Sequence, residues 1–378
     1  MIHPCFLGAG LATSLGTGVV ENVAGLHETP RPAQIFERRV DGRTETIPYK
    51  PLRGSPLDAR RRLDEAIDAV VEEALHEAQL TPVERRTMAL CVGSSSFDIS
   101  VSEFLYREEL QRGSDALPLR SSSLGNIAEA VRARFGLRGE DFSFNTACTA
   151  SANGLWYAAR LIQSGEVDHA LVLGVELLND ITALGLLGLG LLSRSTMRPF
   201  DSRRDGMVLG EACAALVLGR GDPGVFHWKG GANLCDTASM VAATTDGSTI
   251  AAVMRQTLAD AGLDPDAIAA VKVHGTASPS NDDAEAAGLV RTFDPMPPVC
   301  ALKPFIGHTL GASGLAELIL FYRALEQGFL VSTPGIGDSL DVSGVALNQR
   351  EQPVADGWFL LNSFGFGGNN TSLVIGRS

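Results

Sequence analysis

The amino-acid sequence repeats a short pattern in its two halves, and this repeat restricts the fold more than any other feature. CTASANGL at 148–155 and HTLGASGL at 308–315 align at an offset of 160 residues, and each begins an amphipathic run. We infer two similar halves, residues 1–232 and 233–378, packed about a pseudo-twofold axis. In such a pair the N-termini of equivalent helices converge, so Cys148 and His308 are expected to face one site.

The chain alternates apolar strands with helical patterns. Apolar stretches run into glycine-containing turns at 5–10, 90–96, 171–176 and 271–277. Helical patterns such as Pro56–Gln79 and Ser248–Ala261 lie between them. This alternation predicts an α/β fold with layered sheets.

Composition excludes several classes of protein. The 378 residues are 45% hydrophobic, which predicts a large core, and the net charge of −13 opposes sequence-independent binding of nucleic acid or anionic membranes. Residues 1–10 lack a positively charged leader, and no apolar run approaches the roughly 20 residues of a membrane span, so we expect a cytoplasmic protein. The longest apolar run, Ile181–Leu192, is interpreted as core or subunit contact, or as the wall of an apolar substrate tunnel.

Six cysteines show neither C-x-x-C pairs nor metal-ligand spacing, so we predict reduced thiols, no metal and no cofactor. Five are interpreted as small buried hydrophobes: Cys5, Cys91, Cys213, Cys235 and Cys300. Cys148 differs because it begins an amphipathic run, where the helix dipole favours the thiolate, and because its small neighbours leave room for a substrate. A nucleophile and a buried thiol both remain open for it.

Three further features favour catalysis. His274 stands where an apolar strand enters a small-residue loop, and His308 follows Lys303 by five residues in KPFIGHTLGASG, although each histidine alone also fits a structural role. The segment NSFGFGGNN at 362–370 permits positive φ angles and exposed N–H groups, which suit an oxyanion hole, a mobile gate or a simple tight turn. It lacks the spacing of a phosphate-binding loop.

These motifs resemble a known family. NTACTASANGL, VHGTASPSNDDAE, LKPFIGHTLGASGLAE and NSFGFGGNN are similar, in order and approximate spacing, to those of elongating β-ketoacyl-[acyl carrier protein] synthases. The resemblance runs from about residue 80 to the end and includes RPFDSRRDGMVLGEA at 198–212. It implies the thiolase fold, a duplicated five-layer α/β/α/β/α architecture, and a dimer.

The resemblance also assigns residues. Cys148 is the implied nucleophile, and its N–H and that of Phe364 form the oxyanion hole. His274 and His308 are implied to bind the thioester carbonyl of the malonyl substrate. By their positions, Lys303 and Glu317 are implied to orient and polarise this site, Phe364 to act as its gate, and Asp282 and Glu285 to be structural.

The implied reaction is the decarboxylative Claisen condensation of a Cys-bound acyl chain with malonyl-[acyl carrier protein], in fatty acid or polyketide/polyene-type biosynthesis. The partners are acyl- and malonyl-loaded acyl carrier protein, and a second copy or a chain-length-factor-like subunit. Because carrier proteins are acidic, a basic docking patch is expected, with Arg61, Arg62 and Arg204 as candidates beside the alternative of ordinary solvated or internally paired arginines.

Three other functions stay open. A noncatalytic chain-length-factor-like subunit shares the implied fold, but it lacks the nucleophilic cysteine that this chain keeps at Cys148. A coenzyme A thiolase uses a second cysteine near the C-terminus, where this chain has NSFGFGGNN. A cysteine hydrolase is supported by a cysteine and a histidine alone.

Overall fold

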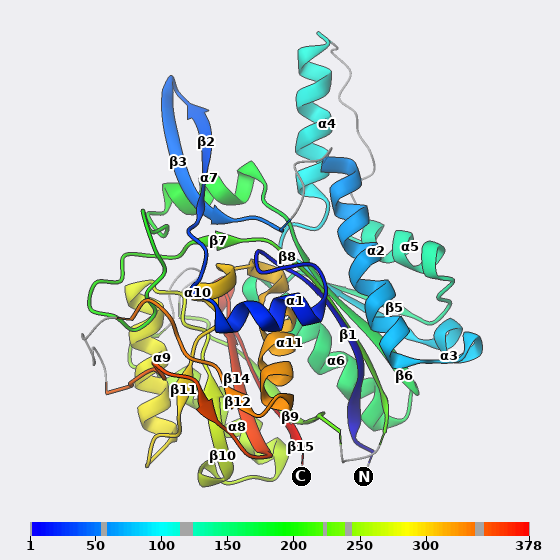
Figure 1. Ribbon diagram of the computed structural model, residues 1–378, viewed down its shortest axis with the longest axis vertical. Helices are drawn as coiled ribbons and strands as arrows, with labels where there is room; N and C mark the ends of the chain where they lie inside the picture. The colour runs from blue at the N-terminus through cyan, green and yellow to red at the C-terminus, as the bar shows by residue number, and fades with distance from the viewer. Residues whose placement is uncertain are drawn as a thin grey trace.

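Two five-stranded sheets form the centre of the protein in a computed structural model (Figure 1). The structure describes residues 2–53, 59–113, 124–221, 225–238, 244–336 and 344–377. The first sheet has the order β1 (Pro4–Ala12), β8 (Ala212–Arg220), β6 (His169–Glu176), β4 (Ala89–Gly93) and β5 (Asp141–Phe144). The second has the order β9 (His227–Cys235), β15 (Asn369–Arg377), β14 (Gly357–Phe364), β10 (Ile268–Lys272) and β11 (Val299–Cys300).

The two sheets repeat the same topology, which confirms the predicted duplication. In each sheet the first two strand pairs are antiparallel and the last two are parallel. The sheets join at their first strands through Cys5 and His227, so that they form one continuous ladder of ten strands. The loops that follow equivalent strands therefore lie at equivalent places in the two halves.

Helices complete the five layers. Between the sheets lie α6 (Ala150–Ser164) and α11 (Ser313–Glu326), the two amphipathic runs of the repeat, whose apolar side chains share one core. Ala152 and Gly314 bring them together, since a Cβ on Gly314 would lie 2.6 Å from the Cβ of Ala152. The small residues of both motifs are thus explained by helix packing.

The outer layers cover the far faces of the sheets. On the first sheet lie α2 (Ala59–Ala78), α4 (Ile99–Gln111) and α5 (Asn126–Phe135), and on the second lie α8 (Ser248–Ala261) and α9 (Pro279–Thr292). The helices predicted at 56–79 and 248–261 correspond to α2 and α8. Within the part of the chain that the structure describes, no helix combines the length and the apolar character that crossing a bilayer requires.

Shorter helices and strands lie outside these five layers or connect them. They are α1 (Val19–Ala24), α3 (Pro82–Thr87), α7 (Asp180–Gly188), α10 (Lys303–Ile306), β2 (Gln34–Val40), β3 (Arg43–Lys50), β7 (Leu209–Gly210), β12 (Phe329–Leu330) and β13 (Gln352–Pro353). The β2–β3 hairpin and α4 project from the same end of the molecule (Figure 1). The apolar run 181–192 is only partly buried. Leu186 is buried, whereas Ile181 and Leu189 are 67% and 58% exposed.

Candidate active site

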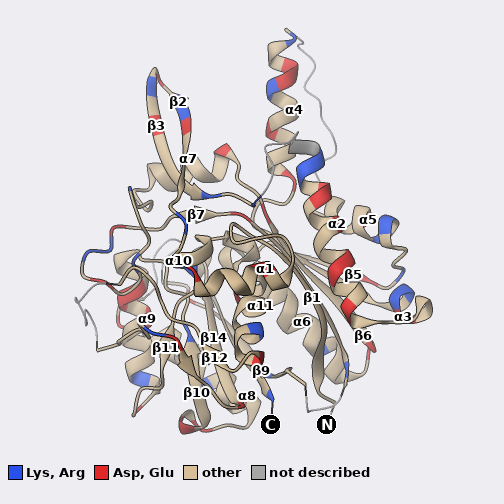
Figure 2. Cartoon of the chain, in the orientation of Figure 1, with Lys and Arg blue, Asp and Glu red and all other residues tan. Residues whose placement is uncertain are grey.

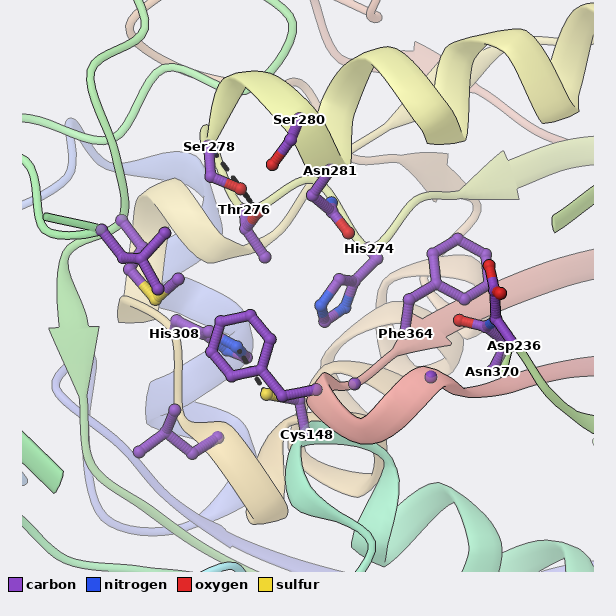
Figure 3. Close-up of a pocket in the computed structure, with 16 residues that line it drawn as sticks. Cys148, Asp236, His274, Thr276, Ser278, Ser280, Asn281, His308, Phe364 and Asn370 are labelled. Carbon is purple, nitrogen blue, oxygen red and sulfur yellow. Dashed lines mark hydrogen bonds between the residues drawn. The ribbon is translucent and has the colours of Figure 1, made fainter. Parts of the chain in front are cut away.

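The two repeated motifs begin with tight turns that meet between the sheets. Cys148 lies in a 3-10 turn, Ala147–Thr149, directly before α6, and His308 stands just before the equivalent turn, Leu310–Ala312, of α11. The residue before each is left-handed, with φ +51° at Ala147 and +75° at Gly307. This shared geometry aims both side chains at one point, and His308 Nε2 lies 3.2 Å from Cys148 Sγ (Figure 3).

His308 is held by its main chain. Its N–H donates to the carbonyl oxygen of Val208 at 2.7 Å, and its own carbonyl oxygen accepts from the N–H of Gly210 at 3.0 Å. Its Nδ1 has no hydrogen-bond partner among the residues that the structure describes. Burial, and then the ammonium group of Lys303, lower the pKa of His308 to about 3, so its imidazole is neutral at physiological pH.

His274 follows β10 and faces the same space. Its ring lies 5.3 Å from the His308 ring, and its Nδ1 lies 3.2 Å from Lys303 Nζ. Since an ammonium group can only donate, Nδ1 is the acceptor and the imidazole proton resides on Nε2. Burial, followed by the Lys303 ammonium group, lowers the pKa of His274 well below its ordinary value, which also keeps this ring neutral.

A buried carboxylate holds Lys303 in place. Glu317 on α11 is fully buried, and its Oε1 accepts from Lys303 Nζ at 2.6 Å and from the hydroxyl of Ser313. A second ammonium group, that of Lys272, reaches Oε2 at 2.9 Å. Although burial acts to raise it, these two ammonium groups lower the pKa of Glu317 to about 2.

Glu285 fixes the main chain of the histidine loop. This buried residue of α9 accepts from the N–H of His274 at 2.8 Å and from that of Gly275 at 2.9 Å. Asp282, one turn earlier, accepts from the N–H of Ala277 at 3.2 Å and of Phe200 at 2.8 Å. Both carboxylates therefore shape the loop behind His274 and lie apart from the Cys148 sulfur.

One pocket contains all three reactive side chains. Figure 3 shows Cys148, His274 and His308 directed toward a common space, with Thr276, Ser278, Ser280 and Asn281 on one side. Asp236 and Asn370 also line it, and the apolar side chains of the lining are Leu191, Met207, Leu310, Phe364 and Phe366. The pocket thus combines polar groups near the loop of His274 with an apolar wall that suits an acyl chain.

Burial has the largest effect on the pKa of the Cys148 thiol. It raises the pKa of the thiol to about 11, and Glu176 adds to the rise, while Lys303 and the N–H groups of Phe366 and Cys148 act in the opposite direction. The sequence predicted a thiolate favoured by the helix dipole. That prediction is wrong for the free protein, because removing the sulfur from water outweighs the favourable dipoles.

Comparisons with known proteins decide the family. The N-terminal domain model of β-ketoacyl synthases matches residues 56–223, and the C-terminal domain model matches residues 228–336. The chain belongs to the β-ketoacyl synthase family. This β-ketoacyl synthase is 29% identical to the chloroplastic 3-oxoacyl-[acyl-carrier-protein] synthase I of Arabidopsis thaliana over 351 residues, which cover 83% of this chain and 72% of that protein.

Solved structures share the whole fold of this β-ketoacyl synthase. The ishigamide ketosynthase/chain length factor has a TM-score of 0.88 and 26% identity, with all of both chains covered. A ketosynthase in complex with its chain length factor from Xenorhabdus doucetiae has a TM-score of 0.85 and 24% identity, covering 100% of this chain and 98% of that chain. The predicted thiolase fold is confirmed.

The sequence predicted the N–H of Phe364 as an oxyanion donor, but another amide lies at the Cys148 sulfur. The N–H that points to the Cys148 sulfur belongs to Phe366. Phe364 is still within β14, opposite Asn370 on β15, and its ring contacts the His274 ring at 5.8 Å. The chain leaves the ladder only after Phe364, and Phe366, two residues beyond the predicted position, directs its N–H at the sulfur.

Phe364, predicted as the gate, is the more enclosed of the two phenylalanines in this segment. Phe364 is 4% exposed, whereas Phe366 is half-buried on the pocket wall beside Cys148. Gly367 and Gly368 follow it with φ of +79° and +76°, which confirms the positive φ angles expected of this segment. A half-buried ring beside left-handed glycines can move with less repacking than a ring held in a strand.

Two of the three arginines predicted as docking candidates form ion pairs within the chain. Arg62 donates to the buried carboxylate of Glu211, with Nη1 3.1 Å from Oε1. Arg204 has 6% of its side chain exposed and donates to Asp283 at 2.7 Å. The alternative of an internally paired arginine therefore describes Arg204, and the guanidinium group of Arg62 is likewise bound to a carboxylate.

Arg61 is the exposed one of these arginines, with 75% of its side chain in solvent, and it pairs with Glu65 on the next turn. Figure 2 shows the basic residues of α2 at the start of the helix, followed by acidic residues along the rest of it. A carrier protein that docks here would meet Arg61 among carboxylates.

The sequence did not single out Lys272 or Phe366 of the synthase. Lys272 carries a recognisable signal, because it is a charged residue within the otherwise apolar strand IAAVKV. Phe366 carries no such signal in the sequence, because it differs from Phe364 only in lying beyond the end of β14. The prediction that Cys235 is buried is wrong, because it is exposed, whereas the other five cysteines are buried.

Proposed function

We propose that this β-ketoacyl synthase joins an acyl chain held on Cys148 to a malonyl group on an acyl carrier protein by decarboxylative Claisen condensation. The observation that carries the proposal is the convergence of one thiol and two neutral imidazoles in one pocket. His308 Nε2 lies 3.2 Å from Cys148 Sγ, and the rings of His274 and His308 lie 5.3 Å apart. The products are the β-ketoacyl-[acyl carrier protein], CO2 and the unloaded carrier.

Acylation is the first step. Cys148 attacks the carbonyl carbon of an acyl-carrier thioester, a new C–S bond forms, and the bond to the carrier sulfur breaks. Because Cys148 is a thiol at neutral pH, its proton must leave during the attack, and His308 Nε2 is placed to accept it and return it to the departing carrier sulfur. The N–H groups of Phe366 and Cys148 bind the developing oxyanion.

Decarboxylation supplies the nucleophile for the second step. The bond between the malonyl carbon and its carboxylate breaks, CO2 leaves, and the electron pair forms an enolate on the thioester. Nε2–H of His274, fixed by Lys303 at Nδ1, donates to the enolate oxygen. His308 can donate from Nε2 as well, because its unpartnered Nδ1 leaves the proton free to reside on either nitrogen.

Condensation then closes the cycle. The enolate carbon attacks the acyl carbon on Cys148, a C–C bond forms, and the bond to the Cys148 sulfur breaks. The released thiolate regains a proton, and the chain is longer by two carbons. The apolar wall of Leu191, Met207 and Leu310 provides the surface against which the acyl chain would lie.

A dimer is part of the proposal. β5 is the outer strand of the first sheet in the described part of the chain, and its residues are half-buried in one protomer. A second strand added along β5 would satisfy its free main-chain groups. The partner is a second copy of this chain or a chain-length-factor-like subunit, and the ishigamide ketosynthase/chain length factor favours keeping the second alternative.

Each half supplies part of the proposed site. We place the boundary between the halves at residues 232 and 233, so that Cys148 belongs to the first and both histidines to the second. The two family matches meet close to this boundary, at residues 223 and 228. Catalysis then requires both halves of the duplicated fold.

Intact mass spectrometry tests the proposed function. The protein is incubated with a panel of acyl-carrier thioesters, beside the Cys148→Ala variant, and malonyl-carrier protein is then added. Acyl mass on Cys148 followed by a product two carbons longer is the expected result. A wild-type protein that never acylates, even with a chain-length-factor-like subunit present, would contradict the proposal.

A further inference from the structure

Lys272 is a buried ammonium group that the reaction steps above do not use. It is 1% exposed at the end of β10, two residues before His274, and it is outside the described lining of the pocket. Its Nζ donates to Glu317 Oε2 and to the carbonyl oxygen of Asn362, each at 2.9 Å. A charged side chain this buried needs polar partners, and Glu317 and Asn362 provide them beside the loop of His274.

The choice of lysine at this place is unusual for the chain. Of its 31 basic residues four are lysines, at positions 50, 229, 272 and 303, and the last two meet on Glu317. An ammonium group is a compact charge with three donors, whereas guanidinium is planar and larger. The enclosed space around Glu317 therefore suits two ammonium groups, one on each carboxylate oxygen.

Charge balance extends beyond Glu317. Two ammonium groups on one carboxylate leave an excess positive charge in the core. Burial, the larger effect, raises the pKa of Glu285, whereas Lys272 acts to lower it. The link is Asn362, whose carbonyl oxygen accepts from Lys272 while its side-chain Nδ2 donates to Glu285 Oε1 at 3.2 Å. Lys272, Lys303, Glu285 and Glu317 thus form one buried set of two basic and two acidic groups.

This set holds His274 from two sides. Lys303 contacts Nδ1 of the ring, and Glu285 accepts from the main-chain N–H. The charged or titratable groups around the ring are Lys303 from α10, Glu317 from α11 behind it, Glu285 from α9, His308, and Lys272 from its own strand. Lys272 contacts Glu317 directly and reaches Glu285 through Asn362, so both supports depend on it.

We propose that Lys272 is a positioning residue for decarboxylation, an inference that rests on the proposed function. Its ammonium group donates to Oε2 of Glu317. Lys303 therefore bonds only to Oε1 and stays directed at Nδ1 of His274. Without that charge Lys303 turns toward the vacated oxygen, and the proton of His274 is no longer fixed on Nε2. Cys148 acylation relies on His308 and the N–H of Phe366 and is affected far less.

The kinetic test separates the two half-reactions. Lys272→Met removes the charge at similar length, Lys272→Gln keeps an N–H donor without the charge, and Lys229→Met removes a lysine that stacks on Trp358 away from the site. Malonyl-carrier decarboxylation and Cys148 acylation are measured for each folded variant. We expect Lys272→Met to lower kcat for decarboxylation about 100-fold with KM little changed, and to lower the acylation rate less than about threefold.

Equal losses in both half-reactions, or no loss in either, would overturn the inference, because a merely structural lysine would not distinguish them. Lys229→Met is expected to behave as the wild type. If Lys272→Met does not fold, Lys272→Gln takes its place with the same expected contrast between decarboxylation and acylation.

Histidine tautomers give a readout that needs no turnover. In 15N-histidine-labelled wild-type protein we expect His274 to carry its proton on Nε2, and in Lys272→Gln we expect a mixture of tautomers. A wild-type His274 protonated on Nδ1, or an unchanged tautomer in the variant, overturns the inference. If the wild type fails to decarboxylate malonyl-carrier protein but the tautomer shift occurs, the proposed function fails while the positioning role of Lys272 stands.

Discussion

His308 Nε2 lies 3.2 Å from Cys148 Sγ, although 160 residues separate them. The contact joins two equivalent turns of a duplicated fold, each preceded by a left-handed residue. Because neither half contains both groups, the reactive pair exists only when the two halves pack with α6 against α11.

The pH dependence of Cys148 alkylation is the first prediction. Since the pKa of the buried thiol is raised to about 11, its thiolate fraction should increase about tenfold per pH unit between pH 7 and 9. The rate of alkylation by iodoacetamide should follow, measured by peptide mass in a Cys235→Ser background that removes the exposed cysteine. A rate that levels off near neutral pH would indicate a preformed thiolate instead.

Replacement of His274 should separate the two half-reactions. Its Nε2–H is the proposed donor to the enolate oxygen, so His274→Ala should lower the rate of malonyl-carrier decarboxylation by roughly 100- to 1,000-fold. Acylation of Cys148, followed by intact mass, should persist because His308 and the oxyanion amides remain. Decarboxylation at the wild-type rate in this variant would remove His274 from the mechanism.

Glu317→Ala should destabilise the protein more than any exposed carboxylate variant. It leaves Lys272 and Lys303 without their shared buried partner, which typically costs roughly 3–5 kcal/mol. The free energy of unfolding in urea measures this loss. Glu326→Ala on the same helix removes a partly exposed pair with Arg323 and should cost about 1 kcal/mol or less, so similar losses in the two variants would contradict the assignment.

Glu317 should also contribute to acid sensitivity. Its pKa is lowered from 4.5 to about 2 in the folded state, so the carboxylate stabilises the protein fully above pH 4.5 and loses that contribution as the pH falls toward 2. Unfolding free energies measured across this interval should fall in the wild type. In a Glu317→Gln variant that folds, the part of the decline due to this group should be absent.

Ser143→Pro should disrupt the dimer without unfolding the protomer. Glu140 and Phe144 direct their carbonyl oxygens to β4, so by alternation the main-chain groups of Ser143 point outward from the sheet edge. Proline there removes a donor that β4 does not use. Light scattering after gel filtration should show a monomer for Ser143→Pro and a dimer for Ser143→Ala, whereas a dimeric Ser143→Pro would exclude pairing along β5.

Local patterns were sufficient to predict much of the architecture. The offset between the two motifs predicted the duplication, because equivalent helices need equivalent small residues where they cross, as at Ala152 and Gly314. The motifs likewise predicted that Cys148, His274, His308 and Lys303 would lie together, and the structure places them within hydrogen-bond or ring contact of one another.

Tertiary structure alone decided the electrostatics and the orientation of the site. A sequence shows that Cys148 begins a helix, but burial depends on the opposite half of the fold, and burial is what raises its pKa. In the same way the sequence leaves open whether Arg62 and Arg204 are solvated or paired, and only the fold places Glu211 and Asp283 beside them. Residue types and spacing along the chain specify which groups meet, whereas desolvation and pairing arise between distant segments, so only the packed structure determines them.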